Sequence, residues 1–160
     1  MIEVTGNLWS YDAGLKPWDI ARVITTNGTV KNNGEAVMGR GCAREAADMW
    51  PRLPEYLGQR LARFGNHVFD LGTWGQVDYL LSMPVKHHWR EQASLTLICQ
   101  SRNELETVAT AIGVECVVLP RPGCGNGGLE WDGDYGVRQH LSVLDDRFHV
   151  ITYGREDGAS

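Results

Sequence analysis

The stretch "ECVVLPRPGCGNGGLEW", from Glu115 to Trp131, joins an apolar run to a loop that holds Gly123, Gly125, Gly127 and Gly128 within six positions. A short apolar run bounded by turn residues is typical of a buried strand, so we expect a strand over 115–120. Each glycine costs roughly 0.5–1 kcal/mol relative to alanine within a regular element. The loop that leaves this strand therefore needs bare backbone.

The rest of the chain alternates strand-like runs with amphipathic segments. Strands are expected at 20–27, 67–72, 77–84 and 148–154, and helices within 35–50 and at 54–65, 95–112 and about 135–144. This alternation predicts an α/β fold with a mixed or mainly parallel sheet covered by helices on both faces. Ligands of such sheets collect beyond the carboxyl ends of the strands, where the glycine-rich loop begins.

Size and composition indicate one globular domain. The chain has 160 residues, of which 42% are hydrophobic and 22% charged, enough to bury a full core. We expect a single domain over 1–153 and a frayed polar tail, "GREDGAS", over 154–160. The sequence contains no run of about 18 apolar residues, so no membrane span is predicted. The first residues lack the basic and apolar regions of a secretory signal.

Cysteine usage and charge narrow the partners. Cys42, Cys99, Cys116 and Cys124 are scattered and form no C-x-x-C pair. This pattern favours free thiols in a reducing cytoplasm and predicts no metal site. The formal net charge of −5 argues against broad, non-specific adhesion to duplex nucleic acid. A small basic patch around one pocket is compatible with that charge.

A second glycine-bearing loop, "GEAVMGRGCA", places Gly34, Gly39 and Gly41 just ahead of a predicted helix. Backbone N–H groups at a helix start or in a nest bind anions, and glycine lets a phosphate approach closely. Two such loops favour a diphosphate site over two ordinary turns. There is no G-x-x-x-x-G-K-[ST] motif, so a P-loop nucleotide hydrolase is excluded, and "GRGCAR" matches a dinucleotide fingerprint only loosely.

Three motifs, "ITTNG…VMGRGCA", "MPVKHHWR" and "GCGNGGLEW", follow one another along the chain. Together they resemble the macrodomain family, and within it the branch that holds the DarG antitoxin macrodomain and terminal ADP-ribose protein glycohydrolase. The resemblance runs from Gly6 to about Phe148. It implies a three-layer α/β/α fold with a mixed central sheet, and a pocket that binds ADP-ribose without a further cofactor.

The resemblance also implies roles for single residues. Lys86 falls on the lysine that carries catalysis in this branch, and Asn27 on the asparagine beside the distal ribose. Residues 28–36, "GTVKNNGEA", form an insertion relative to the DarG pattern, on the side where substrate beyond the ribose would lie. In "TGNL", Asn7 stands where the family has an acidic residue that contacts adenine. The implied ADP-ribose-binding residues are Asn7, Leu8, Gly39, Arg40, Gly41, Cys42, Gly123, Cys124, Gly125, Asn126, Gly127 and Gly128.

Cleaving ADP-ribose from an acceptor breaks a bond at the anomeric carbon of the distal ribose. Lys86 could form a Schiff base with the aldehyde carbon of the opened sugar, or stay charged and polarise the ribose or the leaving group. The sequence leaves both routes open, and without the resemblance Lys86 reads as an ordinary solvated lysine. Asn27 is expected to bond the ribose hydroxyls, against the plainer interpretation of an asparagine that ends a strand.

The sequence thus predicts an ADP-ribosyl glycohydrolase that removes mono-ADP-ribose from a macromolecule. Thymidine in DNA is the first expected acceptor. The protein glycohydrolase has an aspartate in its second loop where this chain, like DarG-like sequences, has Gly127. Acidic protein side chains are the second expected acceptor. His87, His88 and Trp89 are candidate acceptor contacts, with base stacking on Trp89 set against an ordinary half-buried tryptophan. The alternatives are a reader that only binds ADP-ribose, and a phosphatase that acts on ADP-ribose 1″-phosphate.

Overall fold

A mixed six-stranded sheet forms the centre of the molecule, with the strand order β1–β6–β5–β2–β4–β3. The computed structural model describes residues 1–153. The strands are β1 Ile2–Thr5, β2 Ile20–Asn27, β3 Phe69–Asp70, β4 Tyr79–Lys86, β5 Cys116–Pro120 and β6 Phe148–Thr152. Of these strands only β3 runs antiparallel to its neighbour. The carboxyl ends of β2, β4, β5 and β6 therefore lie at the same edge of the sheet.

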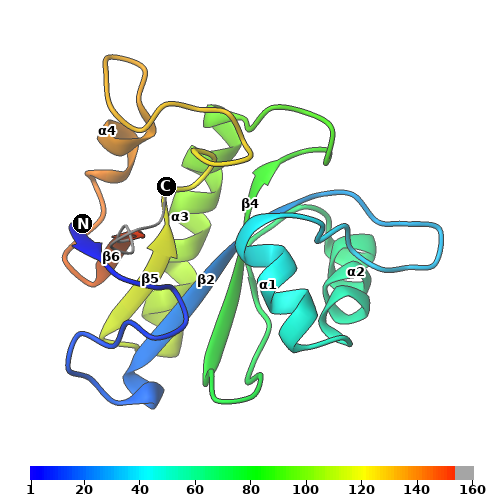
Figure 1. Ribbon diagram of the computed structural model, residues 1–160, viewed down its shortest axis with the longest axis horizontal. Helices are drawn as coiled ribbons and strands as arrows, with labels where there is room; N and C mark the ends of the chain where they lie inside the picture. Colours follow the sequence, from blue (N-terminus) through cyan, green and yellow to red (C-terminus); the bar gives the residue numbers. More distant parts are fainter. Residues whose placement is uncertain (154–160) are drawn as a thin grey trace, which may run out of the picture.

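Helices cover both faces of this sheet (Figure 1). They are α1 Gly41–Met49, α2 Leu53–Phe64, α3 Leu95–Ile112 and α4 Val137–Leu141, with a short 3-10 helix, η1, at Pro17–Asp19. One core cluster packs α3 and α4 against the sheet, and a second cluster packs α1 and α2 against its other side. Burying one leucine such as Leu57 or Leu105 contributes about 1.5–3 kcal/mol. The fold is therefore the expected three-layer α/β/α arrangement.

Local sequence signals explain the ends of the long helices. Ser94 caps α3, since its Oγ accepts a hydrogen bond from Leu97 N at 3.2 Å. Gly113 follows the same helix with φ 80°, a left-handed conformation that favours glycine. Pro54 lies in the first turn of α2, where its missing N–H has no partner to lose. The predicted helix at 95–112 is confirmed at both ends.

Most of the predicted elements are confirmed, with some differences. The strand predicted at 67–72 is reduced to the two residues Phe69–Asp70, and the strand predicted at 77–84 begins at Tyr79. The first strand, Ile2–Thr5, was not predicted, because only Val4 among its residues is partly buried and the segment carries no apolar run. The last helix is shorter than expected, at Val137–Leu141. The predicted strand ending at Pro84 continues to Lys86. The predicted tail over 154–160 lies outside the described residues. Within residues 1–153, no helix has the length and apolar character needed to cross a bilayer.

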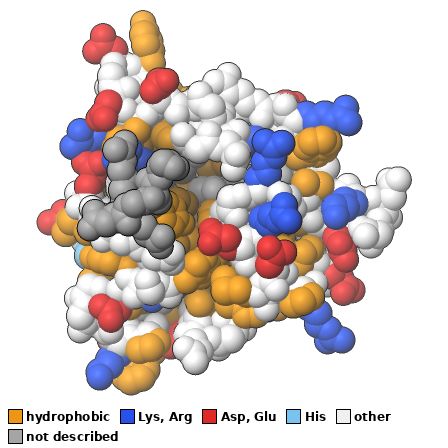
Figure 2. Space-filling model, viewed as in Figure 1, with side chains coloured by type: hydrophobic (Ala, Val, Ile, Leu, Met, Phe, Trp, Pro, Cys, Tyr) orange, Lys and Arg blue, Asp and Glu red, His pale blue; other side chains and the backbone are white. Residues whose placement is uncertain are grey.

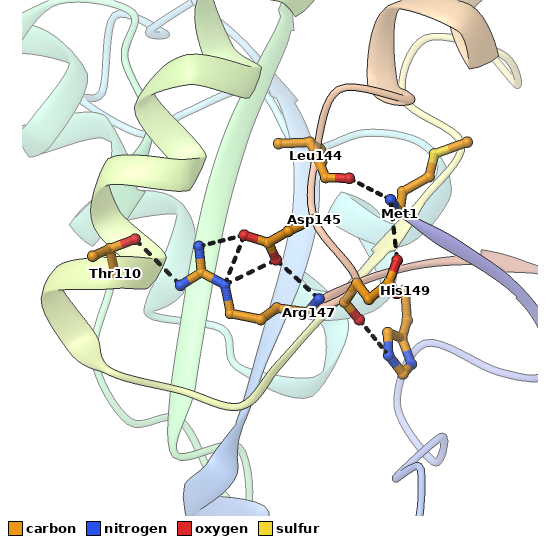
Figure 3. Close-up of polar contacts among 7 residues, drawn as sticks. Met1, Thr110, Leu144, Asp145, Arg147 and His149 are labelled. Atoms are coloured by element: carbon orange, nitrogen blue, oxygen red, sulfur yellow. Dashed lines mark hydrogen bonds and ion pairs between the residues drawn. The ribbon is translucent and has the colours of Figure 1, made fainter.

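The turn that precedes β6 is fixed by polar contacts to α3 and β1 (Figure 3). Arg147 Nε donates to Asp145 Oδ1 at 3.0 Å, and its Nη1 donates to Thr110 Oγ1 at 3.2 Å. The hydrogen bond from Arg147 lowers the pKa of the Asp145 carboxyl. The amino group of Met1 donates to the carbonyl of Leu144. These contacts hold the start of β6 in register, so that its far end reaches the edge where the other parallel strands also end.

Candidate functional site

A cavity of about 1210 Å³ lies at the carboxyl ends of β2, β4 and β5 and beside the residue that follows β6. Most of the residues that the three sequence motifs singled out line it. They are Asn27, Gly39, Arg40, Gly41, Cys42, Lys86, Trp89, Gly123, Gly125, Asn126, Gly127 and Gly128. The fold therefore brings together two glycine-bearing loops and a lysine that are far apart in the sequence.

The amino end of α1 forms one wall of this cavity. Gly41, Cys42 and Ala43, the first residues of the helix, all line it. The first N–H groups of a helix have no partner within the helix, and they carry the positive end of its dipole. No acidic residue lies in the first turn of α1, and Arg40 makes no side-chain cap. This wall therefore offers unpaired N–H groups to an anion.

The loop after β5 forms the opposite wall. Its turn is closed by hydrogen bonds from Leu129 N to Gly123 O at 2.9 Å and from Gly128 N to Gly125 O at 3.2 Å. The intervening N–H groups of Gly125, Asn126 and Gly127 find no acceptor among the described residues. A Cβ on Gly41 would lie 3.4 Å from Asn126 Nδ2. The two walls thus face each other closely enough for one ligand to touch both.

Packing explains some of these glycines but not all of them. Gly123 has φ 74°, and a Cβ on Gly127 would lie 2.5 Å from the carbonyl oxygen of Gly123. The fold itself therefore requires both. Gly39 and Gly125 have no positive φ, and a Cβ on either would meet nothing within 4 Å. Their lack of a side chain leaves open space over the backbone at the cavity, as close approach of a ligand requires.

Two of the three lysines of the chain line the cavity. Lys86 ends β4, and among residues 1–153 it takes part in no ion pair. Lys31, from the 28–36 insertion, lies 3.9 Å from Glu35 Oε2 and has a side chain that is 51% exposed. The sequence motifs indicate a role for Lys86 alone. Lys86 presents an uncompensated amine to the cavity, whereas the charge of Lys31 is partly balanced.

Asn27 lines the cavity, but its amide also fastens the loop that follows β2. Asn27 Nδ2 donates to the carbonyl of Val37 at 3.0 Å, and Oδ1 accepts from Thr29 N at 3.0 Å. The insertion folds into a small hairpin in which Lys31 N donates to Glu35 O at 2.8 Å. Asn27 therefore connects the two ends of this hairpin, which we call the Asn27 latch. The expected ribose contact did not indicate this structural role.

The three candidate acceptor contacts lie in the segment after β4, and one of them lines the cavity. Trp89 does so and is 44% exposed, while its backbone N donates to Thr29 Oγ1 at 3.1 Å. The guanidinium of Arg90 lies 4.8 Å from the centre of the Trp89 ring. His87 and His88 are not among the lining residues, although the His88 ring stacks at 6.0 Å from that of Trp89.

Three of the expected ADP-ribose-binding residues do not line the cavity. Leu8 is fully buried in the core beneath α1 and α2. Asn7 Oδ1 accepts a hydrogen bond from Trp9 N at 2.8 Å, so this side chain caps its own turn. Cys124 packs against the core on the α3 side, and its Sγ donates to the carbonyl of Pro122 at 3.5 Å. Each has a structural task that its motif position did not indicate.

The structure adds residues that the motifs did not reveal. Tyr153 lines the cavity directly after β6, and burial raises the pKa of its hydroxyl to about 12. Arg90, Gln92 and Arg121 also line it. Tyr153 had one usable signal, since it is an aromatic residue near the carboxyl end of the strand predicted at 148–154.

The thiols of this region are not activated. Burial raises the pKa of Cys42, whose Sγ accepts a hydrogen bond from Thr25 N at 3.4 Å. Burial also raises the pKa of Cys124 to about 11. Neither thiol is therefore a candidate nucleophile. In the described part of the chain, no three His, Cys, Asp or Glu side chains cluster as metal ligands would.

Comparisons with known proteins agree with this architecture, although no family model matches the chain. A curated relative from Thermus aquaticus, named DNA ADP-ribosyl glycohydrolase, is 29% identical over 104 residues. This match covers 62% of the chain and 29% of the relative, so the chain corresponds to less than a third of that protein. The macrodomain of Mycobacterium tuberculosis DarG superposes with a TM-score of 0.70 at 26% identity, over 97% of each chain.

A more distant neighbour has the same fold. Thermosipho africanus DarTG, solved in complex with ADP-ribose, superposes with a TM-score of 0.62 at 18% identity. That superposition covers 87% of this chain and 39% of the other. The chain has the macrodomain fold, and its two glycine loops line the cavity at the carboxyl ends of the strands. It is similar to the DarG macrodomain over nearly its whole length, and the resemblance inferred from the motifs is confirmed.

Proposed function

We propose that this macrodomain is an ADP-ribosyl glycohydrolase that removes mono-ADP-ribose from a macromolecule, with thymidine in DNA as the acceptor. The observation that carries the proposal is the placing of Lys86 in the same cavity as two facing walls of unpaired backbone N–H groups. The name of the Thermus aquaticus relative supports the reaction class and the acceptor. The ADP-ribose complex of the Thermosipho africanus neighbour supports the ligand.

The diphosphate of ADP-ribose suits the two walls. Its charge would be met by the first N–H groups of α1 on one side and by those of Gly125, Asn126 and Gly127 on the other. Gly39 and Gly125 leave room for the phosphates to approach the backbone. Tyr153 offers an aromatic face at the end of the cavity formed by the residue after β6. The distal ribose would then lie toward β2 and β4, where Lys86 and Asn27 end their strands.

Lys86 would act on the anomeric carbon of that ribose. As a neutral amine it would attack C1″ and displace the acceptor, which leaves with the bonding electron pair and takes up a proton. Opening of the sugar ring would then give a Schiff base on Lys86, which water hydrolyses to ADP-ribose and the free amine. As an ammonium ion it would instead stabilise negative charge on the departing acceptor. Borohydride distinguishes the routes, because it reduces a Schiff base to a stable secondary amine. The modified peptide is easy to recognise, since Lys16, Lys31 and Lys86 are the only lysines of the sequence.

The acceptor side of the cavity suits a nucleotide. Lys31, Arg90 and Glu91 line the cavity with Trp89, in a protein whose formal net charge is −5. Lys and Arg side chains also lie on this face around the loops that follow β2 and β4 (Figure 2). Cations would hold the phosphates that flank a modified thymidine, and a base can stack on an exposed tryptophan. An acidic protein side chain would form ion pairs with the cations and would not stack on the indole ring.

The test compares two substrates and two lysine variants. The protein is incubated with an oligonucleotide that carries thymidine-linked ADP-ribose and, in parallel, with a protein that carries glutamate-linked ADP-ribose. We expect release from the oligonucleotide, and we expect Lys86→Ala to slow it by about 100-fold or more. Lys16→Ala is the control, since it removes an exposed lysine that does not line the cavity, and it should leave kcat within about threefold.

Each other result has a definite meaning. No release from either substrate, together with ADP-ribose binding, would make the protein a reader of ADP-ribose. Release from the glutamate-linked substrate alone would move the acceptor from DNA to protein. Unchanged turnover in Lys86→Ala would remove the lysine from the mechanism.

A further inference from the structure

The register between β2 and β4 breaks immediately before Lys86. Thr26 pairs with Pro84 in the regular ladder. The next pair joins Asn27 to Lys86, which leaves Val85 without a partner on β2. A bulge of this kind re-aims the neighbouring side chains. Val85 and Lys86 both line the cavity, and the side chain of Val85 is also buried in the core cluster on the α3 side.

The carbonyl groups of this bulge are held from outside the sheet. The carbonyl of Val85 accepts a hydrogen bond from Ser94 N at 2.9 Å. The carbonyl of Lys86 accepts one from Asn66 Nδ2 at 3.0 Å. Ser94 supplies this bond from its backbone, so its side chain does not matter for it. Asn66 is the residue whose side chain anchors the bulge.

Asn66 lies in the loop between α2 and β3 and reaches Lys86 across Gly28. A Cβ on Gly28 would lie 2.9 Å from Asn66 Nδ2 and 2.7 Å from the carbonyl oxygen of His87. Gly28 has no positive φ, so close packing and not backbone conformation requires this glycine. The amide of Asn66 is thus wedged between the segment that follows β2 and the segment that follows β4.

Among residues 1–153, the side chain of Asn66 has one hydrogen-bond partner. Its Nδ2 donates to the carbonyl of Lys86, and its buried Oδ1 accepts no hydrogen bond from the described residues. A substitution that removes the N–H group therefore removes one bond, at the backbone of the lysine itself.

We propose that Asn66 is a positioning residue for Lys86. Its amide fixes the backbone of the bulge so that the lysine side chain leaves it toward the cavity. This role rests on the proposed function of Lys86 in cleavage. Displacing a reacting group by about 1 Å can cost on the order of 100-fold in rate. The diphosphate, by contrast, is held by the two amide walls, which Asn66 does not touch.

Asn66→Asp and Asn66→Ala test the role. Aspartate has the same shape and keeps the packing against Gly28, but it has no N–H to donate. We expect both variants to lower kcat by about 10- to 100-fold while KM and the Kd for ADP-ribose stay within about twofold. A merely structural role would lower thermal stability without this split between kcat and KM.

Ser101→Ala is the matched control. The buried Ser101 Oγ also donates to a carbonyl of β4, that of Pro84, at 2.7 Å. Pro84 is still in the regular register, before the bulge. This variant loses a comparable buried hydrogen bond, so it should lose stability and keep kcat.

A second measurement does not depend on turnover. Reductive methylation with carbon-13 formaldehyde labels the lysines, and Lys86→Arg assigns the signal of Lys86 by NMR. In the free protein we expect this signal to move in both Asn66 variants and to keep its position in Ser101→Ala. The other two lysines, Lys16 and Lys31, serve as internal references.

Wild-type rates and an unmoved Lys86 signal in both Asn66 variants would overturn the positioning role. A loss of kcat in Asn66→Ala that Asn66→Asp restores would also overturn it, because packing alone would then suffice. If the wild-type protein releases no ADP-ribose, the proposed function fails. A Lys86 signal that moves only in the Asn66 variants would still support the positioning role in that case.

Discussion

The carbonyl oxygen of Gly123 lies 2.5 Å from the point that a Cβ on Gly127 would occupy, and the Cβ of Ala93 lies 2.8 Å from the same point. The loop after β5 is therefore closed against itself at this position. Gly127→Ala should force the turn apart, lowering the free energy of unfolding by about 1–3 kcal/mol and weakening ADP-ribose binding. Thermal unfolding and calorimetric titration check this. A variant that keeps both its stability and its affinity would show that the loop has more room than its geometry indicates.

Substitution of Gly125, unlike that of Gly127, should weaken ADP-ribose binding without lowering stability. A Cβ there meets nothing within 4 Å, and φ is not positive. Gly125→Val should therefore change stability by no more than about 0.5 kcal/mol, while its side chain fills the space above the unpaired N–H groups. We expect the Kd for ADP-ribose to rise by at least about 10-fold. If Gly125→Val binds as tightly as the wild type, the diphosphate does not lie over this loop.

Trp89 separates binding of the acceptor from binding of ADP-ribose. Trp89→Ala should raise KM for a thymidine-linked oligonucleotide. The loss in binding free energy should be about 1–3 kcal/mol, the contribution of one stacked base. The Kd for free ADP-ribose should not change. Trp18→Ala is the control, because Trp18 is 62% exposed and lies in η1, before the opposite end of β2. Equal KM values in the two variants would argue against stacking on Trp89.

Asn27 should control the hairpin formed by residues 28–37. Asn27→Ala removes two hydrogen bonds, to Val37 O and from Thr29 N, each contributing about 0.5–1.5 kcal/mol. We expect faster amide hydrogen exchange at Lys31 and Val37, whose N–H groups bond within this hairpin. Asn27→Asp keeps the acceptor for Thr29 and should recover part of the protection. Unaltered exchange in both variants would mean that the latch is dispensable.

Stability should fall in alkaline solution. Burial raises the pKa of the Cys116 thiol from 9.0 to about 11 in the folded protein. The unfolded chain therefore loses this proton first, and the free energy of unfolding decreases as the pH rises from about 9 to 11. Cys124, whose pKa is also raised to about 11, adds to the effect. Urea unfolding between pH 7 and 11 measures the slope, which should be shallower in Cys116→Ala. An equal slope in that variant would assign the effect to other groups.

The layers of the fold could be predicted from sequence because each signal was local. The apolar run Cys116–Pro120 and the capped segment Leu95–Ile112 carry their own period and their own end signals. The strand Ile2–Thr5 carries no such signal. It forms because it pairs in parallel with β6, with Ile2 opposite His149. Pairing between distant segments cannot be predicted from the sequence of either segment alone.

The site divides in the same way. The glycines and Lys86 could be found because their motifs are contiguous, and they do meet in one cavity. The bulge at Val85 and the bond from Asn66 to Lys86 depend on the register between two strands and on a distant loop. Leu8 was predicted to contact the ligand and is instead fully buried, because the core beneath α1 and α2 needs an apolar side chain at that point.

The hairpin at 28–37 and the turn at 87–92 contribute Lys31, Val37 and Trp89 to the lining of the cavity, in addition to the two amide walls. Under the proposed function, changes in this hairpin and this turn would alter the acceptor that is released without altering the binding of ADP-ribose. Exchanging the hairpin with that of a relative is the laboratory equivalent. Such a chimaera should take its acceptor preference from the donor of the hairpin and keep the host's affinity for ADP-ribose.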